Sequence, residues 1–124
     1  MEHRISYTVY YEDTDCLGVV YYANYFKFFE RGRTELLGAY GTSVAELNAG
    51  GVLVVVHSAS ATFKKPLTLG DRFEVVTEFS LPSPYRGRFT QRILCDGEVY
   101  VDGVVDTVSL DTRQNLIEFP KFLK

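Results

Sequence analysis

Residues 22–40 read YANYFKFFERGRTELLGAY and predict the central element of the fold. Apolar positions recur here every three or four residues, which indicates one amphipathic helix of roughly five turns. The apolar stripe runs through Tyr25, Phe29, Gly32, Leu36 and Tyr40. Glycine at position 32 lowers helix propensity by about 1 kcal/mol relative to alanine. We therefore expect this face of the helix to approach a sheet closely.

The sequence on both sides of this helix favours strands joined by short turns. Period-two alternation or apolar, β-branched runs predict strands over residues 5–11, 52–63, 72–79, 88–95 and 99–111. Ser43–Glu46 is a capping-box pattern for a short second helix that stops near Gly50–Gly51. Asp96–Gly97 marks a hairpin, and residues 82–84 are expected to form a connection. The predicted fold class is α+β, a single domain over residues 1–124 with a curved antiparallel sheet of about five strands around one central helix.

Composition limits the classes of function. The chain has 124 residues, 46% of them hydrophobic, and a formal net charge of −3, so it can form a core but lacks the basic surface of a duplex-binding domain. Its two cysteines have no metal-ligand spacing, and no apolar run approaches the length of a membrane span. We expect a cytoplasmic protein with no metal, no cofactor, no nucleic-acid partner and no membrane span.

The start of the long helix is chemically unusual. Residues 12–25 read EDTDCLGVVYYANY, with three carboxylates crowded just before an apolar run. The first amides of a helix lack intrahelical partners and carry partial positive charge. No Ser, Thr, Asp or Asn stands immediately ahead of Tyr22 to cap them. The sequence therefore predicts free amides at this point, chiefly that of Tyr22.

Several motifs in this order resemble the hotdog-fold acyl-CoA thioesterases. The resemblance is to the 4-hydroxybenzoyl-CoA thioesterase-like branch, including the small bacterial enzymes associated with the Tol–Pal system. Its most specific part is residues 11–15 (YEDTD), followed by Gly18–Tyr21 and Asn24–Tyr25. Residues 28–35, 65–71 and 89–93 support it. Tyr22 stands where many Tol–Pal-associated members carry histidine, so we do not carry the short-chain preference of the histidine-bearing members over to this chain.

The resemblance implies hydrolysis of an acyl-CoA thioester to a carboxylic acid and CoA. Asp15 matches the catalytic carboxylate, as nucleophile or as general base, and the backbone amide of Tyr22 matches the oxyanion donor. Substrate contacts are expected from the rest of the motif and from cations that would hold the phosphates of CoA: Gly18, Val19, Val20, Tyr21, Asn24, Lys64, Lys65, Arg86 and Arg88.

Simpler roles remain open for these residues. Asp15 can cap a turn, Asn24 can anchor the loop, and the four cations can be solvated turn charges. Glu12 and Asp13 are expected to be structural. Cys16 is the less favoured nucleophile, because neither histidine of the chain lies near it in sequence.

Assembly and substrate also have alternatives. The family pairs two sheets into one, so we expect a homodimer or homotetramer with sites at the subunit interface. A carrier-protein thioesterase and a non-catalytic acyl-CoA binding protein are the alternative functions. A hotdog dehydratase is less favoured, since its histidine motif is absent.

Overall fold

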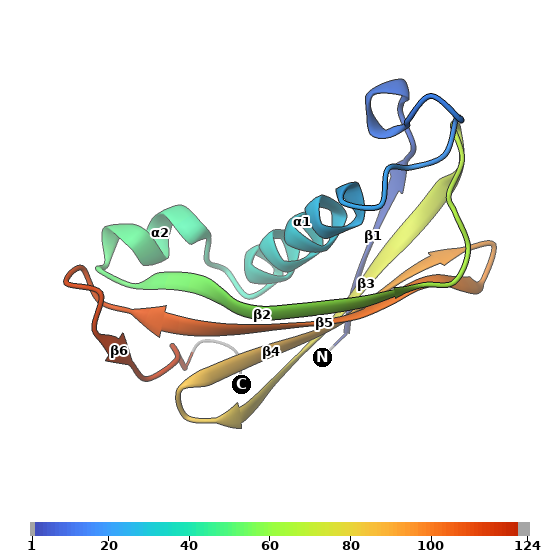
Figure 1. The fold of residues 1–124 in the computed structure, drawn as a ribbon. Coiled ribbons are helices and arrows are strands. Elements are labelled where there is room, and N and C mark those ends of the chain that lie inside the picture. Colours follow the sequence, from blue (N-terminus) through green and yellow to red (C-terminus); the bar gives the residue numbers. More distant parts are fainter. Residues whose placement is uncertain (1, 122–124) are drawn as a thin grey trace.

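One long helix lies across the concave face of a curved antiparallel sheet in the computed structural model, which describes residues 2–121 (Figure 1). The order along the chain is β1 (Glu2–Thr8), a 3₁₀ turn η1 (Tyr11–Asp13), α1 (Asn24–Ala39), α2 (Val44–Ala49), β2 (Leu53–Phe63), β3 (Arg72–Ser83), β4 (Arg86–Cys95), β5 (Glu98–Leu110) and β6 (Leu116–Ile117). Within the sheet the strands lie in the order β1-β3-β4-β5-β2, and β6 pairs with β5. The predicted α+β hotdog class is confirmed, with a sixth, two-residue strand added.

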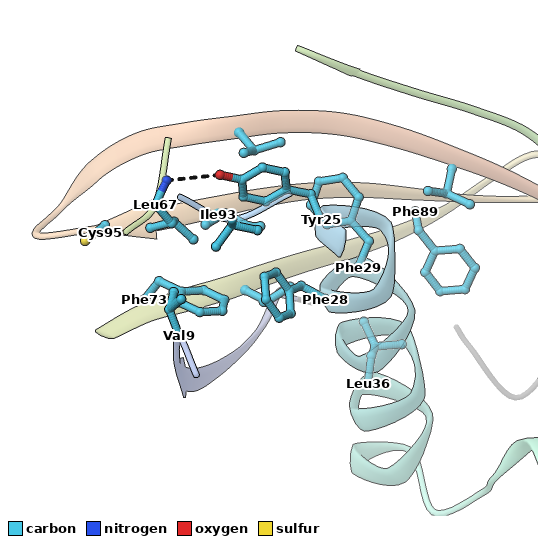
Figure 2. Packing of buried hydrophobic residues seen from close by; sticks show 14 of the residues in the cluster. Val9, Tyr25, Phe28, Phe29, Leu36, Leu67, Phe73, Phe89, Ile93 and Cys95 are labelled. Carbon is cyan, nitrogen blue, oxygen red and sulfur yellow. Dashed lines mark hydrogen bonds between the residues drawn. The ribbon is translucent and has the colours of Figure 1, made fainter. Parts of the chain in front are cut away.

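The helix and the sheet touch closely at Gly32. A Cβ atom added there would lie 2.6 Å from Val75 Cγ1 and 2.8 Å from Thr77 Oγ1, so no side chain fits. On the same face Phe28, Phe29 and Leu36 are buried in the core (Figure 2). The predicted close approach of helix to sheet is confirmed.

Local turn chemistry also follows the sequence. The Ser43 hydroxyl accepts a 3.1 Å hydrogen bond from the Glu46 N–H and starts α2 as predicted. Asp96 and Gly97 both have positive φ, 52° and 76°, as a two-residue hairpin turn requires.

Several predicted boundaries are wrong. The first strand covers Glu2–Thr8 instead of residues 5–11, because Tyr11 enters the η1 turn. Strand β3 runs on to Ser83, so residues 82 and 83, predicted as part of a connection, belong to a strand. Pairing of β1 with β3 ends at Glu78. Pro82 lies in the irregularity of the β3–β4 register between Ser80 and Ser83, where the ladder needs no N–H from it.

No helix within residues 2–121 combines the length and the apolar character needed to cross a membrane.

Candidate active site

Asp13 organises the loop that joins β1 to α1. Its Oδ2 accepts a 2.9 Å hydrogen bond from the Tyr10 N–H. Its carbonyl oxygen accepts two more, from the Tyr21 N–H at 3.2 Å and from Asn24 Nδ2 at 2.9 Å. Asn24, the first residue of α1, therefore anchors the loop to the helix. Asp13 has the structural role expected for it.

Asp15 lies at the turn of this loop. Its N–H donates to the Val19 carbonyl at 2.9 Å, and its own carbonyl accepts from the Gly18 N–H at 3.1 Å. Gly18 has φ of +79°, a conformation that favours glycine. One carboxylate oxygen, Oδ1, accepts from the Leu17 N–H at 2.8 Å. The other, Oδ2, has no hydrogen-bond partner within residues 2–121, so Asp15 caps a turn and still offers a free oxygen.

A second segment of chain holds this loop against α1. The Val20 N–H donates to the Leu67 carbonyl at 2.8 Å, and the Leu69 N–H donates to the Gly18 carbonyl at 3.1 Å. The Leu67 N–H in turn donates to the Tyr25 hydroxyl of α1 at 3.0 Å (Figure 2). These backbone hydrogen bonds add to the side-chain hydrogen bonds of Asp13, Asp15 and Asn24 in fixing the loop.

The start of α1 carries backbone donors that the protein does not use. The helix begins at Asn24, two residues later than predicted, because the Asn24 N–H turns back to the Tyr21 carbonyl at 2.8 Å. The N-cap residue is Ala23, no side chain caps the helix, and its first turn has no carboxylate. In the described chain neither the Tyr22 N–H nor the Ala23 N–H has an acceptor. These amides can therefore donate to a ligand oxygen.

A small pocket opens beside these amides. Its volume is about 220 Å³, and its walls come from the loop, α1 and the end of β2: Val20, Tyr22, Tyr25, Phe63, Lys64, Lys65 and Pro66. The Tyr22 and Phe63 rings lie 6.1 Å apart, edge to face. Tyr25, Phe63 and Pro66 were not predicted as site residues. The sequence did offer one signal for this pocket: Phe63, at the end of a strand, directly precedes Lys64 and Lys65.

The two lysines of this pocket differ in their partners. Lys65 Nζ lies 2.7 Å from Glu98 Oε1, and this hydrogen bond raises the pKa of Lys65. Lys64 has no carboxylate within 4.0 Å of its ammonium among residues 2–121. Lys64 is therefore the less neutralised charge at this pocket.

Arg86 and Arg88 lie elsewhere on the same chain. Arg88 donates to both carboxylate oxygens of Asp106, at 2.8 and 3.1 Å, and Arg86 lies 3.9 Å from the same group. The hydrogen bond from Arg88 lowers the pKa of Asp106. Arg88 pairs with Asp106 and Phe63 with Val101, positions five residues apart on β5, or about 17 Å. The structure does not bring these arginines to the Lys64 pocket within one chain.

The cysteines also differ in their surroundings. Cys16 is exposed beside Asp15, whereas Cys95 is buried, and burial raises the pKa of its thiol. Cys95 packs in the core, the role expected of a small apolar residue.

Comparison with known proteins relates the whole fold to thioesterases. A family model described as the Thioesterase-like superfamily matches residues 9–124. The acyl-CoA thioester hydrolase YbgC of Escherichia coli O6:H1 is 43% identical over 86 residues, which are 69% of this chain and 64% of that protein. The chain thus spans slightly less than two thirds of that relative's length. The acyl-CoA thioesterase YbgC of Haemophilus influenzae is 34% identical over 118 residues, 94% of this chain and 87% of that protein.

Solved structures share the same architecture. A probable thioesterase from Bartonella henselae is 30% identical with a TM-score of 0.90, covering 97% of this chain and all of that one. A gentisyl-coenzyme A thioesterase, BH1999, is 22% identical with a TM-score of 0.89, covering 97% of this chain and 98% of that one, and it shows the fold alone.

Proposed function

Since this chain belongs to the Thioesterase-like superfamily, we propose that it hydrolyses an acyl-CoA thioester to a carboxylic acid and CoA. The proposal rests on two features of the segment between β1 and α1: backbone donors without an acceptor and a carboxylate oxygen without a partner. The Tyr22 and Ala23 N–H groups have no acceptor in the described chain, and Asp15 Oδ2 has no partner in the loop that leads to them. The names of the E. coli and H. influenzae relatives support the same reaction.

The proposed chemistry divides between the amide and the carboxylate. The Tyr22 N–H donates to the thioester carbonyl oxygen and stabilises the negative charge that develops on it, an interaction worth about 2.7–4 kcal/mol in comparable sites. Asp15 acts on the carbon of the same carbonyl. The pocket of Val20, Tyr22 and Phe63 would receive part of the substrate chain.

Two routes satisfy the balance of atoms. As general base, Asp15 takes a proton from water, the resulting hydroxide oxygen bonds to the carbon, the C–S bond breaks, and the CoA thiolate takes up the proton. As nucleophile, Asp15 bonds to the carbon and expels the CoA thiolate, and water then hydrolyses the mixed anhydride. Both routes use the same donor at Tyr22.

We further propose that two chains pair through β2. This strand is an outer edge of the sheet, and none of its residues 53–63 is Lys, Arg, Asp or Glu. Val55, Val56 and Phe63 are exposed along it. The opposite edge, β1, carries Glu2 and Arg4, charges of the kind that prevent edge pairing. A second copy at β2 would form the continuous sheet expected for a homodimer, on which a homotetramer can be built.

Thiol release from a panel of aliphatic and aromatic acyl-CoAs tests the reaction. The proposal predicts release of CoA from at least one class. Matched acyl carrier protein thioesters serve as the comparison. Release from the carrier substrates alone would favour the carrier-protein alternative, and binding of acyl-CoA without release would favour a non-catalytic protein.

A further inference from the structure

A buried glutamine connects the sheet to one arginine of α1. Gln91 is 0% exposed on β4. Its Nε2 donates to the Phe29 carbonyl at 2.8 Å and to Thr77 Oγ1 at 3.0 Å. With both amide hydrogens used, Oε1 is the remaining group, and it accepts from Arg33 Nη1 at 3.1 Å. Gln91 therefore fixes the position of the Arg33 guanidinium.

Arg33 forms no ion pair within the described chain. No carboxylate lies within 4.0 Å of it among residues 2–121. Burial lowers the pKa of Arg33, and the charge of Glu30 opposes that effect only in part. The guanidinium lies 6.0 Å from the centroid of the Phe89 ring. A half-buried guanidinium whose one side-chain hydrogen bond within residues 2–121 goes to Gln91 is a strong site for an anion with two oxygens.

The pocket beside this arginine has apolar walls over much of its lining, together with Glu30, Thr34 and Thr107. Its volume is about 230 Å³, smaller than the roughly 300–1,000 Å³ of pockets for drug-sized ligands. Leu37, Val44, Val54 and Val56 line it together with Phe89. Arg33 is nine residues beyond Asn24, the first residue of α1, or about 14 Å farther along the helix.

One carboxylate of the chain also lines this pocket. Glu30 is exposed, and its Oε1 accepts from Thr34 Oγ1 at 3.1 Å. Glu30 is three residues before Arg33 on the same helix and attracts its charge, but the two form no ion pair within 4.0 Å. An incoming anion is repelled by Glu30 and attracted by Arg33. The charge of the half-buried Arg33 is less screened by solvent than that of the exposed Glu30.

We propose that this pocket binds a small organic carboxylate, with its oxygens on Arg33 and its apolar body against Leu37, Val54 and Val56. Neutral molecules of the same shape would leave the guanidinium unpaired and bind less well. The proposed hydrolysis releases acids of this class, so identifying the ligand with the reaction product rests on the proposed function. The binding itself does not.

Calorimetric titration of the full chain with benzoate and hexanoate tests the site, with benzamide and hexanamide as uncharged counterparts. The acids are expected to bind at least about tenfold more tightly than the amides, as for a hydrogen-bonded charge. Arg33→Gln should weaken acid binding by about the same factor, and Arg33→Lys by less, because it keeps charge but loses the planar fork. Glu30→Gln should strengthen binding.

Arg31→Gln is the matched control. Arg31 lies on the same helix but lines a different cavity of about 340 Å³ with Arg72 and Tyr7. Acid binding should survive this change. Equal affinity for acid and amide, unchanged affinity in Arg33→Gln, or loss of binding in Arg31→Gln would each overturn the proposal. If an Arg33 variant fails to fold, the acid and amide comparison on the unmodified chain still decides.

Two further measurements distinguish a carboxylate site from a contact between subunits and from the thioesterase site. Light scattering of Arg33→Gln shows whether a second copy neutralises Arg33. Dissociation of the oligomer together with no acid binding to the unmodified chain would overturn the proposal in favour of that contact. Thiol release, measured separately, shows which proposal fails. Turnover without acid binding would refute only the carboxylate site. Acid binding without turnover would refute only the proposed thioesterase activity.

Discussion

The Asn24 side chain donates a 2.9 Å hydrogen bond to the Asp13 carbonyl oxygen, and it joins the first residue of α1 to the loop that carries Asp15. The same carbonyl also accepts from the Tyr21 N–H. The Asp13 carbonyl oxygen is therefore one of the atoms that fix the proposed donor, Tyr22, relative to the loop of the proposed carboxylate. This arrangement makes Asn24 a positioning residue in the proposed reaction.

Removing this bond should cost activity more than stability. In Asn24→Ala we expect about 1 kcal/mol lower free energy of unfolding. We expect kcat to fall between about tenfold and a hundredfold, because small misplacements of reacting groups are costly. Steady-state thiol release and urea unfolding measure the two effects. Asn48→Ala, at an exposed position of α2, is the control, and full kcat in Asn24→Ala would contradict the positioning role.

Gly32 and Gly38 provide a matched pair on α1. Gly32→Ala places a methyl group 2.6 Å from Val75 Cγ1 and should destabilise the protein by about 1–3 kcal/mol or more. Apart from its own helix backbone and chain neighbours, an alanine at Gly38 meets no atom within 4 Å, so it should stabilise the helix by about 0.5–1 kcal/mol. Urea denaturation of both variants measures the difference. Equal effects of the two substitutions would show that contact with the sheet is not the reason for Gly32.

Among the lysines and arginines proposed to bind CoA phosphates, residues with and without a carboxylate partner should affect different properties when they are replaced. Lys64→Ala should raise KM for acyl-CoA and reduce its dependence on salt, because Lys64 is not neutralised within the described chain. Arg88→Ala should chiefly lower stability, since it leaves the buried Asp106 with only the more distant Arg86. KM measured against ionic strength for both variants tests this. A salt dependence lost only in Arg88→Ala would assign phosphate binding to that residue instead.

A charge added to the β2 edge should weaken the dimer, whereas a charge added to the β1 edge should not. A lysine at exposed Val55 places a charge on the proposed pairing edge, so Val55→Lys should raise the dimer dissociation constant at least about tenfold. Ser6→Lys makes the same change on β1 and should leave the dimer intact. Light scattering over a concentration series measures the dimer dissociation constant of both variants. A monomeric unmodified chain, or dissociation only in Ser6→Lys, would contradict pairing through β2.

Features set by neighbouring residues could be predicted from sequence. The helical stripe, the Ser43 cap and the Asp96–Gly97 turn depend on residues at most a few positions apart, and the family motif indicated the hotdog class. The exact start of α1 was missed because the Asn24 N–H donates to the Tyr21 carbonyl, and hydrophobic periodicity cannot predict such a hydrogen bond. Strand β6 was missed because two residues carry no periodic signal.

Contacts that depend on strand register could not be predicted. The pairing of Arg88 with Asp106 follows from the alignment of β4 with β5, which the sequence does not specify. The Gln91–Arg33 bond joins residues 58 positions apart. One signal was available for it: Gln91 is a polar residue in the alternating buried series of Phe89 and Ile93. Such a residue needs hydrogen-bond partners in the core.

Turnover by Asp15→Asn tests the central proposal most directly. The amide oxygen of Asn can still accept from the Leu17 N–H, so the loop should keep its shape while the charged oxygen is lost. We expect kcat for thiol release to fall at least about a hundredfold, with binding of acyl-CoA nearly unchanged. Glu12→Gln, at an exposed carboxylate of the same loop, should retain full activity. Near-normal kcat in a folded Asp15→Asn protein would contradict the account.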